Sequence, residues 1–374
     1  MQLWLLPEEE EQNPSPLSSH GVKKGDVWQL GRHFLMCGDS TNPLDVRQLM
    51  QGNQAALVIA DPPYGMGKAG QGVTNDNLYR DNLIEFNKQW IPLTFDFMTS
   101  NGSWYCWGMN GPLMNIYSFI IYPMEKEKQV SFRNLIVWDK GGVNGQNSPL
   151  MRSYPSSDEK CLFVVKGRAM PSRGDTQEDF CEAFEPIRSY LEQEAKKIKL
   201  NNAILKELCG TSSMYSHWFS RSQWALIPEH HYLAIQQYAR DNSIEAFLTD
   251  YSTITEEAGK LDRTSAVIFP YFDNVHDNMN TVWKFDRVQG KEKAETGGHP
   301  TPKPLAIISR IIKSSSKPND LILDPFGGSG TTLIACEFLN RSCYMMEHET
   351  SWCEVILSRW EKYTKQKAFL VHPM

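Results

Sequence analysis

An acid, two prolines and an aromatic ring follow an apolar run in AALVIADPPYG, residues 55–65. Two successive prolines fix the backbone and remove two N–H donors, so they end a strand abruptly. Asp61 and Tyr64 are therefore expected in a stiff turn at the end of a buried strand. A carboxylate there can accept a hydrogen bond from a ligand, and the ring can stack on a planar one. The alternative is a strand-ending turn in which Asp61 only caps the backbone.

A glycine-rich turn, DPFGGSGTT at residues 324–332, lies between an apolar run and a helical pattern. Glycines there permit a tight turn and the close approach of a ligand to the backbone. A phosphate-binding P-loop would need a lysine where Thr331 follows Gly330, and the dinucleotide pattern fails at Leu333. A nucleoside without a pyrophosphate is the ligand that remains, with Glu347 placed for ribose hydroxyls at the end of the next strand. An ordinary strand–helix turn is the alternative.

The elements that must carry these two turns alternate between strand and helix. Before residue 168 the pattern predicts one helix over 84–99 and strands at 26–30, 33–37, 55–60, 102–108, 134–140 and 160–167. A Gly-Arg turn between the first two strands is typical of a type II′ hairpin. After residue 265 the order is strand, glycine turn, helix, strand and a final helix over 352–363. This alternation predicts an α/β sheet with parallel strand pairs.

The segment between these two regions has a helical rather than a strand pattern. Residues 182–210 and 229–242 have helical periodicity, with Gly210 as a stop signal, and we expect two to four helices. The expected organisation is a mobile tail over 1–24, then one α/β domain built from 25–167 and 266–374, with a helical insertion over 168–265.

Composition limits the classes of function. The chain has 374 residues, a net charge of −6 and no apolar run near the ~18 residues of a membrane helix. Its eight cysteines form no CxxC pair, and the acidic N-terminus does not resemble a secretory signal. We therefore expect no structural zinc or other metal, no disulfide framework, no membrane partner and a cytoplasmic location.

DPPYG at 61–65 and DPFGGSGTT at 324–332 together resemble the motifs of S-adenosylmethionine-dependent amino-DNA methyltransferases. The DPPY segment comes first, which is similar to the permuted β-class of that family. HPTPKP at 299–304 resembles the family's segment around the methionine end of the cofactor. The resemblance covers residues 24–167 and 266–363. It implies a doubly wound, Rossmann-like methyltransferase sheet in a bacterial or phage enzyme of the restriction–modification type.

The resemblance also implies roles for residues in the two motifs. Asp61 and the carbonyl of Pro62, held by Pro63, would accept the two amino hydrogens of a flipped base, and Tyr64 would stack on that base. The residues expected to bind S-adenosylmethionine are Asp39, Asp61, Thr301, Lys303, Asp324, Phe326, Gly328, Ser329, Gly330, Thr331 and Glu347. Alternatives remain for three of these sites: a turn acid for Asp39, a core ring for Phe326, and a proline-rich helix entry for HPTPKP.

The target implied by the resemblance is an amino group of double-stranded DNA. In the β-class an Asp at the first motif position favours adenine N6, whereas a Ser favours cytosine N4, so Asp61 favours adenine. Cytosine N4 is the alternative, and RNA or protein substrates are less favoured. A homodimer is left open.

The helical insertion is the expected reader of the DNA sequence. Residues 186–224 carry six positive and three negative side chains in an otherwise acidic chain. Residues 201–224, NNAILKELCGTSSMYSHWFSRSQW, have the pattern of a helix-turn-helix: a helix, a turn that contains glycine, and a second helix. The residues expected to contact DNA are Arg152, Ser213, His217, Arg221 and Gln223. A small helical insert around an aromatic core is the alternative, with Arg152 as a solvated surface residue.

Overall fold

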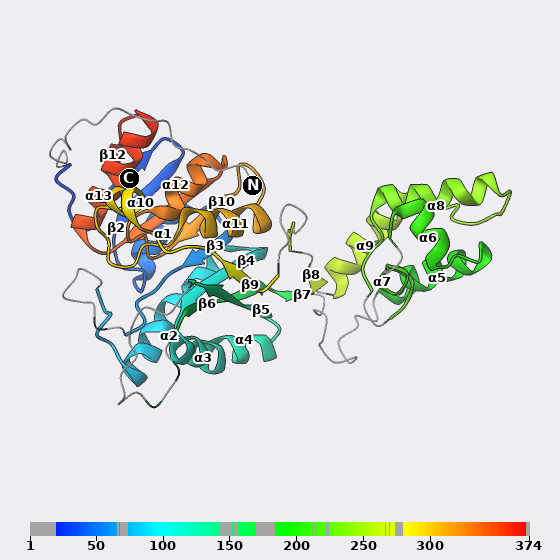
Figure 1. Ribbon diagram of the computed structural model, residues 1–374, viewed down its shortest axis with the longest axis horizontal. Coiled ribbons are helices and arrows are strands. Elements are labelled where there is room, and N and C mark those ends of the chain that lie inside the picture. Colours follow the sequence, from blue (N-terminus) through cyan, green and yellow to red (C-terminus); the bar gives the residue numbers. More distant parts are fainter. Residues whose placement is uncertain are drawn as a thin grey trace. The chain divides into compact units, whose positions relative to one another are not determined.

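The computed structural model of the chain describes residues 20–65, 67, 74–141, 152, 154, 156–169, 184–211, 214–221, 224–265, 267–268, 270–273 and 280–371. The backbone separates into two compact units (Figure 1). The first unit is formed by the described residues of Met1–Met124, Asn134–Val164 and Tyr271–Met374. The second unit is formed by those of Glu125–Arg133 and Val165–Pro270.

A ten-stranded sheet forms the main framework. Its strand order is β12 (Phe369–Val371), β1 (Val27–Leu30), β2 (His33–Cys37), β11 (Ser342–Glu347), β10 (Leu321–Asp324), β3 (Ala55–Ala60), β4 (Met98–Gly108), β6 (Asp158–Lys166), β5 (Val130–Asp139) and β9 (Val282–Lys284). Strands β2, β11, β10, β3 and β4 form successive parallel pairs. The expected α/β sheet with parallel pairs is confirmed, and the β1–β2 hairpin turns at Gly31, which has a φ of 59°.

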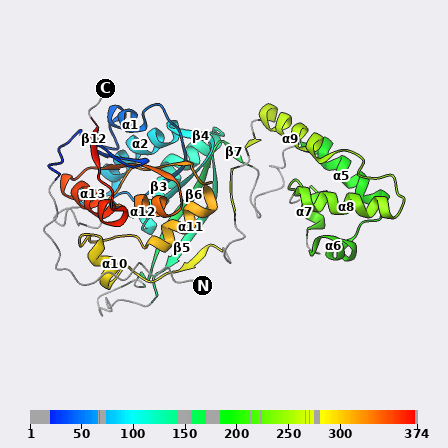
Figure 2. The same cartoon turned by 90° about the horizontal axis from the view of Figure 1, so that it is seen from above.

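Helices cover both faces of this sheet. In Figure 2, α1 (Pro43–Met50) and α2 (Arg80–Asp96) lie on one side, and α11 (Leu305–Ser315), α12 (Thr331–Phe338) and α13 (Thr350–Thr364) lie on the other. The first unit also contains α3 (Asn110–Ile116), the π-helix η2 (Tyr117–Ile121), α4 (Tyr122–Lys126) and α10 (Gly290–Glu295). The central strands are buried on both faces, which explains why AALVIA and LIL are continuous apolar runs rather than alternating ones. The sheet is therefore doubly wound, as predicted.

Aromatic rings fill the layer between α2 and the sheet. Trp104 of β4 stacks between Trp90 and Phe95 of α2, with ring centroids 5.9 Å and 5.4 Å away. Their polar atoms are satisfied inside the core, because Trp104 donates to Thr94 and Trp90 donates to Asn87. This layer fixes α2 and therefore the turn that precedes it.

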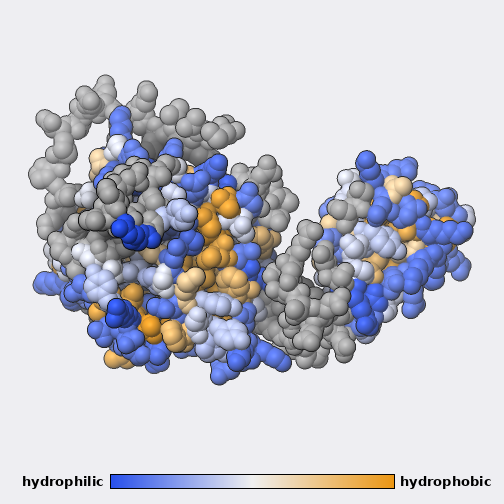
Figure 3. Space-filling model, turned by 60° about the horizontal axis from the view of Figure 1, so that its bottom comes forward, coloured by the Kyte–Doolittle hydropathy of each residue, from blue (hydrophilic) through white to orange (hydrophobic). Residues whose placement is uncertain are grey.

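Apolar side chains also reach the surface of the first unit. Met114 of α3 and Phe119 of η2 are more than half exposed, and Figure 3 shows hydrophobic residues in patches on one face. Scattered apolar side chains are ordinary on a protein surface. None of the helices in the described part of the chain combines the length and the hydrophobicity that crossing a bilayer demands.

The predicted tail falls largely outside the described residues, but its last part is anchored. His20 donates from its backbone N–H to Glu354 of α13 over 2.8 Å, and Val22 donates to the same carboxylate over 3.0 Å. The chain from residue 20 is thus fixed to the final helix, which the sequence pattern of that segment does not indicate.

The second unit is helical. It contains α5 (Glu185–Lys197), α6 (Asn202–Cys209), α7 (Tyr215–Phe219), α8 (Glu229–Asp241) and α9 (Tyr251–Ser265), with the short pair β7 (Arg168–Ala169) and β8 (Val267–Ile268). Its core is aromatic, and includes Phe184, Trp218, Phe219, Trp224, Tyr232 and Phe247. The described residues of this unit thus form five helices where two to four are expected. The continuous helical pattern over 182–210 is interrupted because Lys199 adopts a φ of 50°.

The expected helix-turn-helix segment has an unusual form. Gly210 ends α6 with a φ of 69°, as the sequence predicts, but α7 has only five residues. Helix α6 packs mainly on α8, and α7 packs mainly on α5. The aromatic core of the alternative interpretation is present, and reading of DNA by this segment stays a prediction.

We predict that Asn201→Ala loosens α6, because the Asn201 side chain accepts hydrogen bonds from the N–H groups of Ala203 and Ile204 at 2.9 Å and 3.1 Å. Loss of such a cap costs about 1 kcal/mol, so amides of α6 should exchange with deuterium about fivefold faster. Asn202→Ala, at the exposed first position of the same helix, is the matched control. Equal exchange rates in the two variants would contradict the capping role.

Candidate functional site

Four parallel strands deliver acidic residues to one edge of the sheet. Strand β3 is followed by Asp61, β10 ends at Asp324, β11 ends at Glu347, and β2 is followed two residues later by Asp39. Because these strands are neighbours and parallel, their carboxyl ends meet at the same edge. Residues that lie more than 250 positions apart in sequence are thereby brought together.

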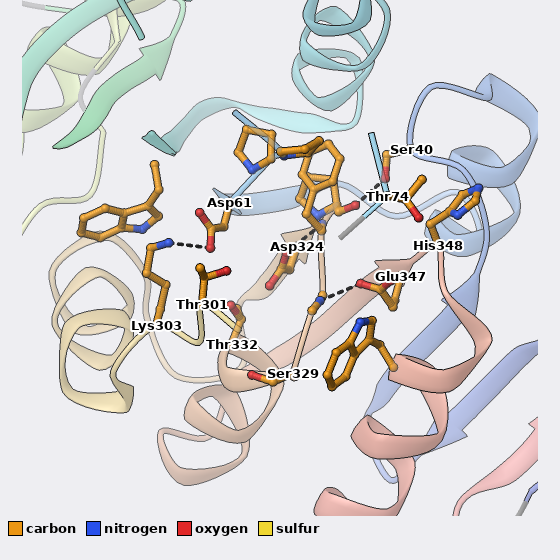
Figure 4. A pocket seen from close by; sticks show the side chains of 18 of the residues that line it. Ser40, Asp61, Thr74, Thr301, Lys303, Asp324, Ser329, Thr332, Glu347 and His348 are labelled. Atoms are coloured by element: carbon orange, nitrogen blue, oxygen red, sulfur yellow. Dashed lines mark hydrogen bonds and ion pairs between the residues drawn. The ribbon is translucent and has the colours of Figure 1, made fainter. Parts of the chain in front are cut away.

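A pocket lies where the direction of winding changes. The helix after β10, α12, covers one face of the sheet, whereas the helix after β3, α2, covers the other. The strand ends separate at such a point and leave a crevice for a ligand. Figure 4 shows Asp61 and Lys303 at one end of this pocket, Glu347 and His348 at the other, and Asp324 between them.

The glycine turn brings its backbone against the pocket. A side chain on Gly327 would place its Cβ 2.8 Å from Met345, and Gly328 has a φ of 51° with His299 only 3.2 Å from a hypothetical Cβ. The Gly328 N–H donates to a carboxylate oxygen of Glu347 over 2.7 Å. The other oxygen of Glu347 accepts from the Glu349 N–H over 2.7 Å. These glycines are required by close contacts, and they fix the carboxylate at the end of β11.

Two carboxyl groups in this half of the pocket have a pKa near 7. Burial raises the pKa of Glu347 to about 7, although the N–H groups of Glu349 and Gly328 favour its ionised form. Burial also raises the pKa of Asp324 to about 7, against the hydroxyl of Thr332. Ligand groups that donate hydrogen bonds to these carboxylates would favour ionisation.

The Asp61 carboxylate is bound on both oxygens. The ammonium of Lys303 lies 2.6 Å from one oxygen, and the Tyr64 hydroxyl lies 3.0 Å from the other. The same hydroxyl lies 2.9 Å from Glu159, and its single proton is donated to one acid at a time. Burial raises the pKa of Asp61, and the Lys303 ammonium opposes this rise.

Two further acids hold this end of the pocket in place. One oxygen of Asp76 accepts from the N–H groups of Tyr64 and Gly65 at 3.1 Å and 3.0 Å, which fixes the turn after the prolines. Glu159, at the start of β6, lies 2.8 Å from Lys303 and 2.6 Å from Lys140. Burial opposes its ionisation, but the two ammonium groups hold the pKa of Glu159 at about 2. The motif-based prediction misses both acids. Neither acid belongs to a motif, and Glu159 directly precedes the predicted strand at 160–167.

Trp107 lines the pocket at the end of β4. It is fully buried, its indole N–H has no hydrogen-bond partner in the structure as described, and the Lys303 ammonium lies 5.7 Å from its ring centroid. A buried donor without a partner is costly. An acceptor on a bound ligand would satisfy it.

Most of the residues predicted from sequence meet in this one pocket. Asp61, Pro62, Pro63 and Tyr64 all line it. So do the predicted cofactor residues Asp39, Thr301, Lys303, Asp324, Phe326, Gly328, Ser329, Thr331 and Glu347. Gly330 does not; it precedes α12 with a φ of 79°. Lining residues that the sequence interpretation misses include Ser40, Thr74, His299, Thr332, His348 and Trp352.

Three of the predicted cofactor residues also have structural partners. Asp39 accepts from the backbone and the hydroxyl of Thr41 at 2.8 Å and 2.7 Å, as a turn acid does. The ring of Phe326 packs edge-on against Trp90 at 4.9 Å. The Lys303 ammonium lies on Asp61 and Glu159, so its contact with a cofactor carboxylate stays a prediction.

Those residues predicted to contact DNA that the structure describes are not among the residues lining this pocket. Arg152 is exposed and belongs to the first unit, whereas His217 and Arg221 belong to the second. Arg221 forms an ion pair with Glu185 over 3.1 Å. Ser213 and Gln223 fall outside the described residues. Among the side chains that the structure describes, no cluster of His, Cys, Asp or Glu could hold a metal ion.

Comparison with known proteins gives a consistent set of relatives. A family model described as "DNA methylase", for N6 and N4 methyltransferases, matches residues 55–358. The Type II methyltransferase M1.MboII of Moraxella bovis is 24% identical over 327 residues, which cover 86% of this chain and 95% of that protein. The Type II methyltransferase M2.MboI of the same organism is 36% identical over 139 residues, which cover 35% of this chain and 50% of that protein. The solved M1.HpyAVI–SAM complex aligns with 17% identity and a TM-score of 0.45, over 87% of this chain and 97% of that one.

We predict that Glu347 makes the stability of the ligand-free chain depend on pH. Its pKa is raised from 4.5 to about 7, so between these values the folded chain keeps a proton that the unfolded chain releases. The free energy of unfolding should therefore fall as the pH rises from 5 to 8, on the order of 3 kcal/mol from this group. In urea unfolding, Glu347→Gln should remove that part of the slope.

Glu337→Gln is the control for this measurement. The hydrogen bond from His33 lowers the pKa of Glu337 to about 2, although burial acts to raise it. Glu337 therefore stays ionised above pH 5. Its replacement should lower stability by the same amount between pH 7 and 8, because His33, whose pKa burial lowers below its usual 6.5, is largely neutral in that range. Parallel curves for wild type and Glu347→Gln would contradict the assignment.

Proposed function

This chain belongs to the DNA methylase family of N6 and N4 amino-methyltransferases, and we propose that it methylates the N6 amino group of adenine in double-stranded DNA. The observation that carries the proposal is the single pocket in which the Asp61–Tyr64 turn meets the glycine turn and Glu347. One end of this pocket suits an amino group, and the other suits a nucleoside. A methyl donor and a base could lie end to end between them.

S-adenosylmethionine, the methyl donor of this family, supplies a methyl group on a sulfonium, which is a good leaving group. The glycine turn fits its nucleoside, because Gly327 and Gly328 line the pocket with backbone that no side chain of their own covers. Glu347 would accept hydrogen bonds from the ribose hydroxyls, and Asp39 and Phe326 would lie near the adenine ring. Ionisation of Glu347 would accompany this contact.

The chemical task of the other end is to activate a weak nucleophile. The lone pair of an aromatic amino group is delocalised into the ring, so its hydrogens must be held out of the ring plane. We propose that Asp61 accepts one hydrogen and that the carbonyl of Pro62, aimed by two fixed proline φ angles, accepts the other. The nitrogen gains a methyl group and releases a proton, for which the Asp61 carboxylate is the nearest base.

Recognition of the base rests on two groups beside Asp61 and on the identity of residue 61 itself. Tyr64 offers a ring on which a flipped base can stack, a contact worth ~1–3 kcal/mol. The Trp107 indole N–H would pair with the ring nitrogen next to the amino group, which is an acceptor in both adenine and cytosine. An Asp rather than a Ser at position 61 supports adenine, and cytosine N4 is the alternative.

The helical unit is our candidate for reading the target sequence. We propose that residues 168–265 form the recognition region. It separates the catalytic half of the methyltransferase domain, residues 25–167, from its cofactor-binding half, residues 266–374. Its exposed Lys199 and Lys206 make no ion pair in the described structure and are available to phosphates. M1.MboII comes from a bacterium, and we propose that this chain also acts in a bacterial cell, in the cytoplasm.

The base is decided by analysing the product. Plasmid DNA methylated by the purified chain and digested to nucleosides should yield N6-methyladenine, identified by mass spectrometry. N4-methylcytosine as the only product would overturn the choice of adenine and leave membership of the family intact. Sequencing of the same DNA with a method that detects modified bases would report the recognition sequence.

We expect Asp61→Asn to lower the single-turnover methylation rate at least about 100-fold, because the variant keeps the shape and loses the charged acceptor. Binding of S-adenosylmethionine, measured by calorimetry, should weaken by less than about tenfold, because Asp61 is one of eleven residues expected to bind it. Asp81→Asn, in the exposed first turn of α2, is the control with unchanged rate. A fully active Asp61→Asn variant would exclude Asp61 as the acceptor.

A further inference from the structure

Four charged side chains alternate in sign across the buried end of the pocket. The order is Asp61, Lys303, Glu159 and Lys140, with contacts of 2.6 Å, 2.8 Å and 2.6 Å between successive groups. All four belong to the first unit. The side chains of Lys303 and Glu159 are only 6% and 7% exposed. Charges buried to this degree are tolerated only when each is paired.

The position of Lys303 creates an electrostatic difficulty for the proposed reaction. The target nitrogen must approach Asp61 and acquire positive charge as its new bond to carbon forms. An ammonium 2.6 Å from the same carboxylate would repel that charge and compete for the acceptor oxygen. The site therefore needs a group that offsets Lys303 without occupying the place of the base.

Glu159 meets this requirement by its contacts. One of its oxygens lies 2.8 Å from the Lys303 ammonium and 2.9 Å from the Tyr64 hydroxyl, and the other lies 2.6 Å from Lys140. It therefore offers Lys303 and Tyr64 an alternative partner when the amino group takes its place on Asp61. With Glu159 ionised, the four charged groups sum to zero.

We propose that Glu159 is a positioning residue for methyl transfer, which holds Lys303 and the Tyr64 hydroxyl beside Asp61 and neutralises the positive charge next to the target nitrogen. This inference rests on the proposed function, since it assigns a role around the same Asp61. It holds for adenine and for cytosine, because both present an amino group there.

The groups facing Asp61 set the expected pH dependence. Tyr64, Lys303 and Glu159 contact Asp61 directly or through one another, and Lys140 lies behind Glu159. The other groups that face Asp61 are Asp324 at the end of β10 and the buried thiols of Cys106 on β4 and Cys161 on β6. The two thiols are neutral, because burial raises their pKa well above the usual value. Asp61 must be ionised to act, so the methylation rate falls as the pH drops through its pKa. The Glu159 charge raises that pKa and the Lys303 charge lowers it.

The test compares pH profiles of the single-turnover rate on DNA saturated with enzyme and S-adenosylmethionine. Glu159→Gln should lower the plateau rate about tenfold or more and shift the acidic limb down by about one pH unit. Lys303→Met should shift the same limb up by about one unit. In the double variant the limb should return toward its wild-type position, because one charge of each sign has been removed.

Matched controls separate positioning from simple damage to the fold. Asp158→Asn removes the neighbouring acid of the same strand, which pairs with Lys160 over 2.6 Å, and should leave rate and limb unchanged. Binding of S-adenosylmethionine by Glu159→Gln should stay within about threefold of wild type. A lower rate with an unshifted limb would mean that Glu159 is merely structural, and an unchanged rate would also overturn the proposal. The methylated base is identified separately, so a wrong choice of base is distinguishable from a wrong role for Glu159.

Discussion

The Lys303 ammonium, buried between Asp61 and Glu159, is the contact on which the site depends. It joins two segments that lie 242 residues apart in the chain and gives each carboxylate a partner away from water. A buried charge whose partner is lost costs several kcal/mol, so the three side chains constrain one another. The sheet brings their backbones together, and this ion pair selects the side-chain arrangement. Glu347 and the glycine turn form a similar constraint at the other end of the pocket.

The sequence predicts the parts of this site that local chemistry determines. Two prolines indicate the turn after β3, because they restrict its backbone to one conformation. Glycines indicate the turn after β10, because its backbone conformation and close contacts exclude side chains. Parallel strands could also be predicted, since their apolar runs are continuous. The side chains that contact Asp61 could not be predicted from the sequence. Glu159 and Asp76 become part of the site through the order of strands and the course of a loop, and neither has a local signature.

The helical unit shows a limit of periodicity. The helical pattern continues over 182–210, yet the backbone turns at Lys199 and the next helix starts with a cap at Asn201. The apolar positions on both sides of the break face one core, so the pattern continues although the helix does not. Trp218, which lies in the short α7, and Trp224, which follows it, also belong to that core. Arg221, predicted to meet DNA, forms an ion pair with Glu185.

The strand order carries a consequence for synthesis of the chain. Strand β3 lies between β4, which follows it closely in sequence, and β10, which is made more than 250 residues later. During translation β3 has one long-range neighbour missing until the ribosome has passed the whole helical unit. Such late pairings slow folding and leave a sheet edge open in the meantime. The nascent chain therefore exposes one edge of β3, next to a DPPY turn that still lacks Lys303, until β10 emerges and pairs with that edge.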